Sequence, residues 1–236
     1  MLTFVEKLLG VFREFGVLGG VLYGVGKALR RSGAGFHLYF YEIMVQPISE
    51  KPLAPKNLTK SFELREIKAA DPELAKFPRS EKVVAERFEQ GVICLGGFQK
   101  SEFIGYLWIQ FGKYYEDEVR CLFAPEPESE AVFDFDIYIF PDHRFGIGFI
   151  ALWDGANEFL KRRGIRFTCS RVSRFNVASR KSHEHFGWKC IGRTVFLCGA
   201  TSQLMLGTIK PYFHFSLKKA NLPKIRINTN SRLVNE

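Results

Sequence analysis

The sequence predicts an α+β fold, because stretches with strand character alternate with helical stretches through the middle of the chain. Two observations carry this prediction. An apolar strand, Val132 to Phe140, passes through a glycine-containing loop into a helical stretch, Phe149 to Arg163. A second strand, Ile165 to Val172, leads into a short helix from about Val177 to Phe186. Strand, loop, helix, strand and helix therefore follow one another in a fixed order.

Further elements flank this central region. Aromatic and β-branched residues or strict alternation predict strands, and one amphipathic stretch predicts a helix. The last stretch, Leu204 to Ile209, fits either a strand or a short helix. The other expected elements are a strand at Phe36 to Val45, a strand at Phe62 to Ile67, a helix at Ser80 to Gln90, a hairpin of Val92 to Phe98 with Phe103 to Phe111 around Gln99 to Glu102, and a strand at Cys190 to Leu197.

The N-terminal stretch, Met1 to Arg31, is apolar but fits neither a signal peptide nor a membrane span, because charges interrupt it and its uncharged run, Gly16 to Gly26, is short. Its glycines weaken any long helix. Two interpretations stay open: a helix packed on the domain or on a second copy of the chain, or a peripheral anchor on anionic lipid. Apolar residues recur there at helical spacing: Leu2, Val5, Leu8, Leu9, Phe12 and Phe15.

The domain organisation follows from these elements. Residues 1–60 form an N-terminal helix, a strand and a proline-containing linker, residues 61–209 form the main domain, and residues 210–236 form a basic tail. A length of 236 residues is compatible with one compact core plus appendages. With 46% hydrophobic residues, the chain has ample apolar surface to bury.

Composition also limits the classes of function. The five cysteines are an odd number without paired metal-ligand spacing, which disfavours a disulfide framework and a zinc site, so we expect reduced thiols in the cytoplasm and no metal. The net charge of +9 is scattered without a recognition motif, which disfavours nucleic acid as a partner. A basic surface equally attracts an anionic coenzyme or the inner face of a membrane.

The loop after Val132 to Phe140 has the chemistry of a phosphate site. Gly146 and Gly148 let the backbone approach a ligand closely, and His143 and Arg144 add potential positive charge beside them. The helix that begins directly afterwards contributes free backbone N–H groups and the positive end of its dipole. An ordinary strand-to-helix turn is the alternative interpretation of a glycine pair alone.

The second helix carries its own signals. Asn176 is placed to cap its N-terminus, and Gly187 is placed to end it in the left-handed conformation. Ser179 and His183 follow Asn176 at helical spacing, and Trp188 follows Gly187.

These two motifs resemble those of the GNAT superfamily of acyl-CoA-dependent N-acyltransferases, with a pattern Q/R-x-x-G-x-G/A and a later N-x-x-A/S-x-x-x-Y-x-x-x-G-F. In this sequence, His143 takes the Gln/Arg place, His183 takes the tyrosine place and Trp188 replaces phenylalanine, while the glycines and Asn176 are intact. The resemblance covers roughly Phe62 to Gly199.

The resemblance implies a mixed, mainly antiparallel central sheet flanked by helices, with an N-terminal helical appendage. It implies acetyl-CoA, or another acyl-CoA, as co-substrate. Its pyrophosphate would lie on the loop, and its acyl carbonyl would meet a backbone N–H near Ile139. The implied coenzyme-binding residues are Ile137, Ile139, His143, Arg144, Phe145, Gly146, Ile147, Gly148, Asn176 and Ser179.

The resemblance further implies an acetyltransferase that lets the amine of a small acceptor, such as an amino sugar, attack the thioester directly. The chain is also similar, at Tyr41 to Pro47, to a bacterial subgroup associated with surface polysaccharide production. Two alternatives stay open: a noncatalytic scaffold of the same fold recruited to a membrane or a biosynthetic complex, and an acyltransferase with a different acyl donor.

Three side chains are candidates for proton transfer. Strand alternation places Asp134 and Asp136 on one face, followed by Tyr138, and either carboxylate is a candidate base for the amine. His183 is a candidate acid for the departing thiolate in its cationic form, or a packing residue. The acidic loop Glu116 to Glu118 is a further place to look for the base.

Overall fold

The computed structural model of the chain describes residues 4–144, 146–184 and 186–230, and of residues 4, 5, 7 and 8 it describes the backbone alone. Two compact units make up these residues. Unit 1 comprises residues 4–45, 115–124 and 171–230, and unit 2 comprises residues 46–114 and 125–170. Each unit is described by itself below. The chain passes from one unit to the other within four strands: β1 (His37–Pro47), β5 (Tyr114–Tyr115), β6 (Leu122–Glu126) and β8 (Phe167–Ser173).

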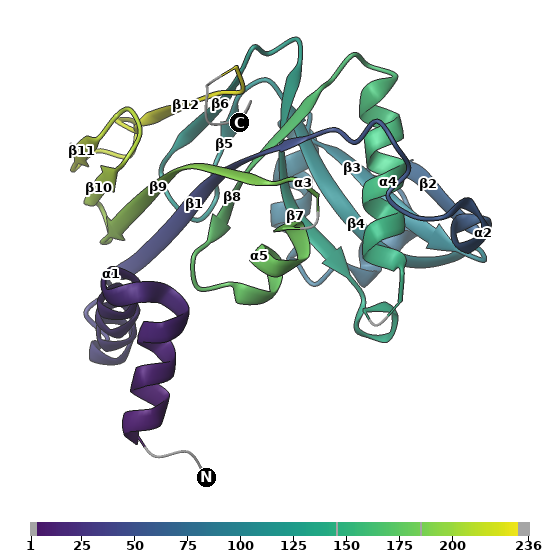
Figure 1. The fold of residues 1–236 in the computed structure, drawn as a ribbon. Helices are drawn as coiled ribbons and strands as arrows, with labels where there is room; N and C mark the ends of the chain where they lie inside the picture. Colours follow the sequence, from purple (N-terminus) through teal and green to yellow (C-terminus); the bar gives the residue numbers. More distant parts are fainter. Residues whose placement is uncertain (1–3, 145, 185, 231–236) are drawn as a thin grey trace. The chain divides into compact units, whose positions relative to one another are not determined.

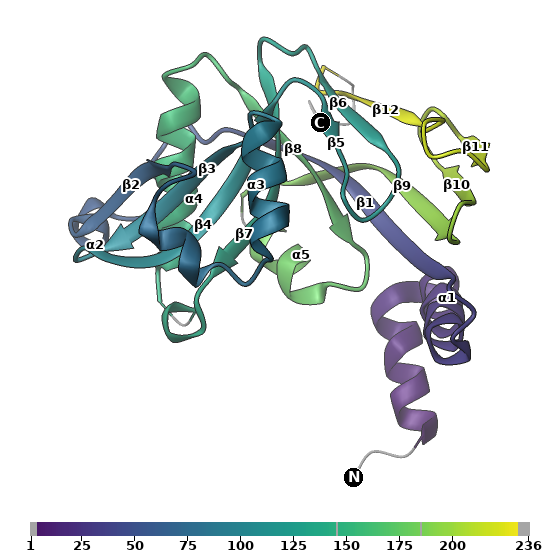
Figure 2. The same cartoon turned by 180° about the vertical axis from the view of Figure 1, so that it is seen from behind.

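Unit 2 contains a sheet with a helix on each face (Figures 1 and 2). Its strands follow the order β2-β3-β4-β7-β8, in which β7 and β8 are parallel and the other pairs are antiparallel. The helix α4 contacts β2, β3 and β4 on one face, and α3 covers the other. The elements besides β8 are β2 (Phe62–Ile67), β3 (Ile93–Gln99), β4 (Glu102–Phe111), β7 (Ala131–Ile139), α2 (Lys56–Thr59), α3 (Glu81–Glu89), α4 (Gly148–Lys161) and the 3₁₀ turns η1 (Pro72–Lys76) and η2 (Pro141–His143).

Unit 1 contains the strand order β1-β9-β10-β11, antiparallel throughout, and a small sheet in the order β12-β6-β5. The helix α1 packs toward β1 through Phe175, which lies between β8 and α5: Phe15 and Tyr23 each contact the Phe175 ring at 5.3 Å between centroids, and Phe40 of β1 contacts it at 6.0 Å. The elements besides β1 and β6 are α1 (Phe4–Ser32), α5 (Val177–Glu184), β9 (Lys189–Cys198), β10 (Gln203–Gly207), β11 (Phe213–Ser216) and β12 (Lys224–Asn228), with β5 (Tyr114–Tyr115) at the boundary of the units.

The expected α+β class, with mainly antiparallel strands, flanking helices and an N-terminal helix, is confirmed. The expected hairpin is present, and its turn residues Lys100 and Ser101 both have positive φ (50° and 67°), which suits the twist of the two strands. Gly16 interrupts α1 with φ 71°, as its glycines suggested. Residues 204–207 are strand rather than helix.

Residues 210–230, the described part of the expected basic tail, contain two strands. Within the described part, β11 pairs with β10, and in β12 the side chains of Ile225 and Ile227 are completely buried. The N–H of Leu122 donates to the carbonyl of Pro223 at 2.9 Å, which joins this segment to β6. Alternation of buried isoleucines with exposed basic residues in Lys224–Asn228 is a strand pattern, hidden in the sequence by the high local charge.

Candidate active site

The loop between β7 and α4 ends in a helix start without a side-chain cap. The turn η2 uses the N–H groups of His143 and Arg144, which donate to Phe140 and Pro141. The residue before the helix, Ile147, carries no capping side chain, and the first helical bond runs from Ala151 N–H to the Ile147 carbonyl at 2.8 Å. The first N–H groups of an α-helix have no partner within the helix, so this start suits an anion.

The two glycines of the loop differ in their surroundings. A Cβ at Gly146 would meet nothing closer than the His143 carbonyl oxygen at 3.8 Å, so the backbone there is open. A Cβ at Gly148 would lie 3.0 Å from Ile104 Cδ1, so this glycine allows α4 to pack against β4. Gly146 therefore has the geometry of a contact point for a ligand, and Gly148 has that of a packing residue. Phe145, also expected in the coenzyme site, lies outside the described residues.

Two basic residues, His143 and Arg144, border the loop. The guanidinium of Arg144 donates from Nε to the Ile139 carbonyl at 3.0 Å and lies 5.3 Å from the centre of the Tyr138 ring. The ring nitrogen Nε2 of His143 is 3.5 Å from a Glu102 carboxylate oxygen. Both side chains thus come from the expected positions, and Arg144 is held against the end of β7.

A bulge interrupts β7 just before this loop. Opposite β4, Phe135 pairs with Trp108 and Tyr138 pairs with Tyr106, so Asp136 and Ile137 together face one residue. Asp136 has φ 48°, a left-handed conformation that aspartate tolerates better than most residues. A bulge leaves its extra residue outside the regular ladder of strand hydrogen bonds. Backbone polar groups near Ile137 are therefore candidates to contact a ligand.

The bulge corrects the expectation that Asp134 and Asp136 share a face. Phe133 and Phe135 both stack on Tyr114, so Asp134 between them points to the opposite face. Asp136 pairs with Arg87, whose guanidinium also lies 5.0 Å from the Phe135 ring centre, so Asp136 is on the Phe135 face. The extra residue shifts the alternation by one, which sequence spacing did not reveal.

Asp136 is fully engaged by two arginines from the start and the body of α3. Arg79 donates from Nε to Oδ2 at 2.9 Å and from Nη2 to Oδ1 at 2.5 Å, and Arg87 donates from Nη1 to Oδ2 at 2.6 Å. The side chains of Asp136 and Arg87 are each only 9% exposed. This cluster fixes the bulge to α3 and leaves the carboxylate little freedom to take a proton from an amine.

Asp134 is buried in the sheet and its carboxyl group faces no solvent. Burial raises its pKa to about 7, and the neighbouring Thr168 hydroxyl and a backbone N–H oppose that shift. A group with this pKa titrates near neutrality, but its position inside the sheet gives a dissolved amine no direct access.

The second motif lies in unit 1 and forms the expected capped helix. The Asn176 side chain accepts a hydrogen bond from Ser179 N–H through Oδ1 at 3.1 Å, and Gly187 has φ 73°. Asn176 and Ser179, both expected near the coenzyme, are thus engaged with each other at the start of α5. Whether they also contact coenzyme stays a prediction.

His183 is buried in α5, with Trp188 5.2 Å away and Phe186 6.4 Å away between ring centroids. Burial lowers its pKa to about 4, because the charged ring would lose its hydration. The imidazole is therefore neutral at pH 7. This corrects the expected cationic form, so a proton donated from an imidazolium is not available there.

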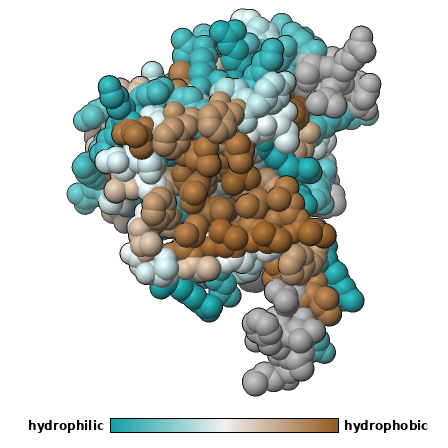
Figure 3. Space-filling view, turned by 90° about the vertical axis from the view of Figure 1, so that its left-hand side faces the viewer, coloured by the Kyte–Doolittle hydropathy of each residue, from teal (hydrophilic) through white to brown (hydrophobic). Residues whose placement is uncertain are grey.

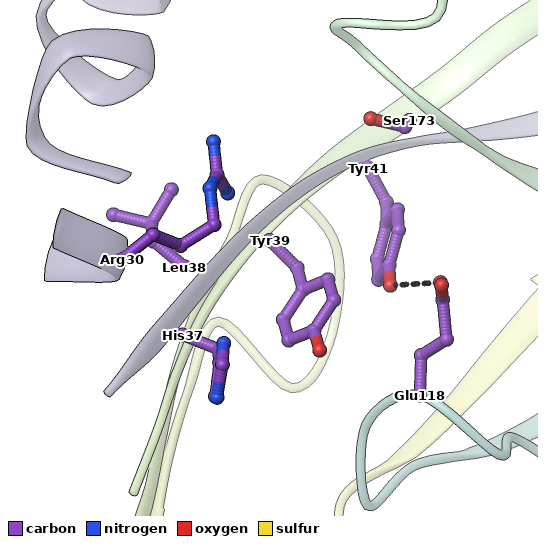
Figure 4. A pocket seen from close by; sticks show the side chains of 7 residues that line it. All are labelled: Arg30, His37, Leu38, Tyr39, Tyr41, Glu118 and Ser173. Atoms are coloured by element: carbon purple, nitrogen blue, oxygen red, sulfur yellow. Dashed lines mark hydrogen bonds between the residues drawn. The ribbon is translucent and has the colours of Figure 1, made fainter. Parts of the chain in front are cut away.

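A pocket of about 290 Å³ in unit 1 is lined by aromatic and charged side chains (Figure 4). The hydroxyl of Tyr41 donates to Glu118 Oε2 at 2.8 Å, and the Tyr39 and Tyr41 rings stack at 5.8 Å. Burial raises the pKa of Tyr41, so the hydroxyl stays protonated and keeps this bond. Tyrosine faces and a half-exposed carboxylate are a suitable surface for a cationic amine. Arg30 and His37 line the other side.

Two buried carboxylates of unit 1 hold arginines: Glu116 of the acidic loop, and Glu42, which was not identified from the sequence. Arg171 pairs with the fully buried Glu116 and with Glu118. Glu42 binds three arginines from different segments: Arg174 at 2.7 Å, Arg180 at 2.9 Å and Arg193 at 3.1 Å. A single glutamate inside the apolar run of β1 was the available signal, because a buried charge needs a partner.

Among the described residues, no group of three or more His, Cys, Asp or Glu side chains is arranged to hold a metal ion.

No protein-family model matches the chain, and no curated protein matches it in sequence. Solved structures of similar fold include GNAT acetyltransferases. A tandem GNAT protein from the clavulanic acid biosynthesis pathway aligns over 73% of this chain and 57% of its own, with 13% identity and a TM-score of 0.47. A putative GNAT acetyltransferase from Novosphingobium aromaticivorans aligns over 68% and 65%, with 9% identity and a TM-score of 0.43. The aminoglycoside acetyltransferase AAC(6')-Iy, solved with a CoA-containing bisubstrate analogue, aligns over 53% and 89%, with 16% identity and a TM-score of 0.39. The first two matches span less than two thirds of those proteins.

Proposed function

We propose that this chain is an acyl-CoA-dependent N-acyltransferase of the GNAT type that transfers an acetyl group to the amine of a small acceptor. The observation that carries the proposal is the start of α4. It lacks a side-chain cap, follows an open glycine at position 146 and has Arg144 beside it. Backbone N–H groups, a helix dipole and a cation at one place form a site for the pyrophosphate of coenzyme A.

The bulge in β7 supports the same proposal. The thioester carbonyl gains negative charge when an amine attacks it, and a backbone N–H outside the strand ladder near Ile137 or Ile139 is suited to donate to that oxygen. One such donor lowers the barrier by on the order of 3 kcal/mol. Arg79 and Arg87 hold the bulge through Asp136, so these residues act by positioning the strand.

The amine needs a group that binds it and removes its proton. Asp136 is engaged by two arginines and Asp134 is enclosed in the sheet, so we place this role on a water molecule or on the acidic loop, of which Glu118 pairs with Arg171 yet stays half-exposed. Its carboxylate lines the pocket of unit 1 beside Tyr39 and Tyr41. Neutral His183 serves as a packing residue in this proposal.

Thiol release measured with acetyl-CoA and a panel of amines tests the function. Release that depends on both substrates supports the proposal, and release that is faster with a longer acyl-CoA would identify a different donor. Coenzyme binding without release from any amine would favour the noncatalytic scaffold. Absence of both binding and release would refute the proposal. Glu118→Gln should lower kcat/KM about 10²-fold or more and leave coenzyme affinity unchanged.

A further inference from the structure

The hairpin of β10 and β11 exposes one apolar face. Leu206 pairs with Phe213, and Leu204 pairs with Phe215, so these four side chains lie on the same side. Met205 and Ser216 on the other side are buried. Phe213 is 61% exposed and Phe215 is 52% exposed, a high exposure for two phenylalanines in one short strand.

The helix α1 covers this face of the sheet at β1. Among the described residues, the same face is left open at β10 and β11. Leu204 pairs with Leu197 of β9, and Leu197 pairs with Leu38 of β1, so the three leucines share a face. Leu38 lies against Gly26 of α1, where a Cβ would be 3.6 Å from Leu38 Cβ. The helix therefore covers the β1 end of this face, and the hairpin continues it without a cover.

The helix itself exposes a further apolar stripe. Val17, Val21 and Val25 recur every four residues, with Leu18 beside them, and all four side chains are exposed, Val17 by 77%. Figure 3 shows apolar side chains as one continuous area on the face that it presents. Continuous exposed apolar areas of this kind mark interaction sites rather than ordinary surface. We call the exposed residues of α1 and the β10–β11 hairpin the apolar face.

Basic residues dominate the charges around the apolar face, and the acidic residues of α1, Glu6 and Glu14, precede its exposed valines. The sequence has no Asp or Glu between Phe15 and Tyr41, and none in residues 185–235. Exposed basic residues lie directly beside the apolar segments, at the end of α1 and on both sides of β11: Lys27, Arg30, Arg31, Lys210, Lys218 and Lys219. An apolar surface with basic residues at its margin matches the interface of a membrane that contains anionic lipids.

We propose that the apolar face docks on an anionic lipid surface, with α1 and the β10–β11 hairpin lying in the headgroup region and the basic residues contacting lipid phosphates. A second copy of the chain is less suited, because a symmetric dimer through this face would bring the same positive charges together. Part of α1, Leu9–Ser32, is long and apolar enough by length and composition to cross a bilayer, contrary to the expectation from its short uncharged run. Crossing would leave the exposed hairpin in water, so the hairpin favours an interfacial position.

Cosedimentation of the full chain with vesicles tests the proposal. The chain should pellet with vesicles of phosphatidylglycerol and phosphatidylcholine, should not pellet with phosphatidylcholine alone, and should be released by salt. Phe213→Glu/Phe215→Glu should weaken binding at least ~10-fold, since two apolar side chains no longer enter the interface. Leu58→Glu in unit 2 is the matched control, because Leu58 is also 50% exposed, and it should bind like the unchanged chain.

Two double variants that replace lysines by glutamates test the electrostatic contribution to vesicle binding. Lys218→Glu/Lys219→Glu should weaken binding by about fivefold or more per lysine, whereas Lys51→Glu/Lys56→Glu, which makes the same charge change on exposed residues of unit 2, should have a much smaller effect. Circular dichroism confirms that each variant is folded. Unchanged binding of the Phe213→Glu/Phe215→Glu variant would overturn the proposal. So would self-association in sedimentation velocity that this variant abolishes, with no vesicle binding by the unchanged chain.

Discussion

Two helices of this chain, α4 and α5, begin shortly after a strand. They differ in whether a side chain of the protein bonds the free backbone N–H groups of the first turn. At α5 the Asn176 side chain accepts the Ser179 N–H, so the protein completes its own helix start. At α4 the preceding residue is Ile147, which has no capping side chain, and the glycine before it is open. Capping stabilises a helix and occupies its N–H groups, whereas an uncapped start keeps them available. The comparison favours α4 over α5 as the proposed anion site.

The largest expected effect comes from a side chain that obstructs the uncapped start of α4. Gly146→Glu places a carboxylate where the pyrophosphate would bind, and the space around Gly146 accepts a side chain without a clash. We expect coenzyme affinity, measured by calorimetry, to fall about 10²-fold or more through repulsion and obstruction. Gly10→Glu, at another glycine with nothing within 4 Å, is the control. Equal affinity of both variants for coenzyme would contradict the assignment of α4.

The second prediction concerns the bulge that leads to α4. Asp136→Asn keeps a residue that tolerates positive φ but removes the charge between Arg79 and Arg87. We expect the free energy of unfolding to fall by about 3 kcal/mol, because a buried guanidinium is left uncompensated. Glu73→Gln, in the more exposed pair with Arg65, should cost less than about 1 kcal/mol. Denaturant unfolding measures both.

A loss of kcat/KM in Asp136→Asn at unchanged stability would instead restore Asp136 as the base.

The third prediction uses the raised pKa of Asp134. In the unfolded chain this carboxyl ionises near pH 3.8 and in the folded chain near pH 7, so the folded state loses stability as the pH rises between these values. Asp134→Asn removes that loss. Its stability advantage over the unchanged chain should grow by about 3 kcal/mol from pH 5 to pH 8. Asp142→Asn, at an exposed position, should show no such trend in thermal unfolding.

The smallest effect is expected at the capped helix. Asn176→Ala should lower the free energy of unfolding by about 1 kcal/mol, and Asn176→Ser should restore most of it, because serine also caps helices well. Coenzyme affinity should remain within about twofold if the side chain only caps α5. A large fall in affinity in both variants would show that Asn176 contacts coenzyme and would remove the contrast between the two helices.

The sequence predicted these two helix starts because their signals are local. Gly146, Asn176 and Gly187 act within a few residues of their own positions: Gly146 leaves open space, Asn176 makes the capping bond, and Gly187 has a positive φ. The bulge was missed because Arg79 and Arg87 reach Asp136 across 57 and 49 residues of sequence. The strand β12 was missed because its partner β6 lies far away in the chain and each is short.

The candidate base also depended on nonlocal geometry. Alternation alone placed Asp134 and Asp136 together, and one extra residue in β7 separates them onto two faces. In the sequence, Glu118 is one of three acidic neighbours that cannot be told apart. In the structure they differ: Glu116 is buried against Arg171, and Glu118 reaches the pocket beside Tyr41. Burial decides such roles, and burial depends on strand pairing that local sequence does not encode.

The central claim is that the uncapped start of α4 binds the pyrophosphate of coenzyme A. Calorimetric titration of the unchanged chain with coenzyme A and with pantetheine, which lacks the nucleotide and its pyrophosphate, tests it most directly. The account predicts that coenzyme A binds at least ~100-fold more tightly than pantetheine, and that Gly146→Glu removes most of this difference. Equal affinities for the two ligands, or an undiminished preference for coenzyme A in Gly146→Glu, would contradict it.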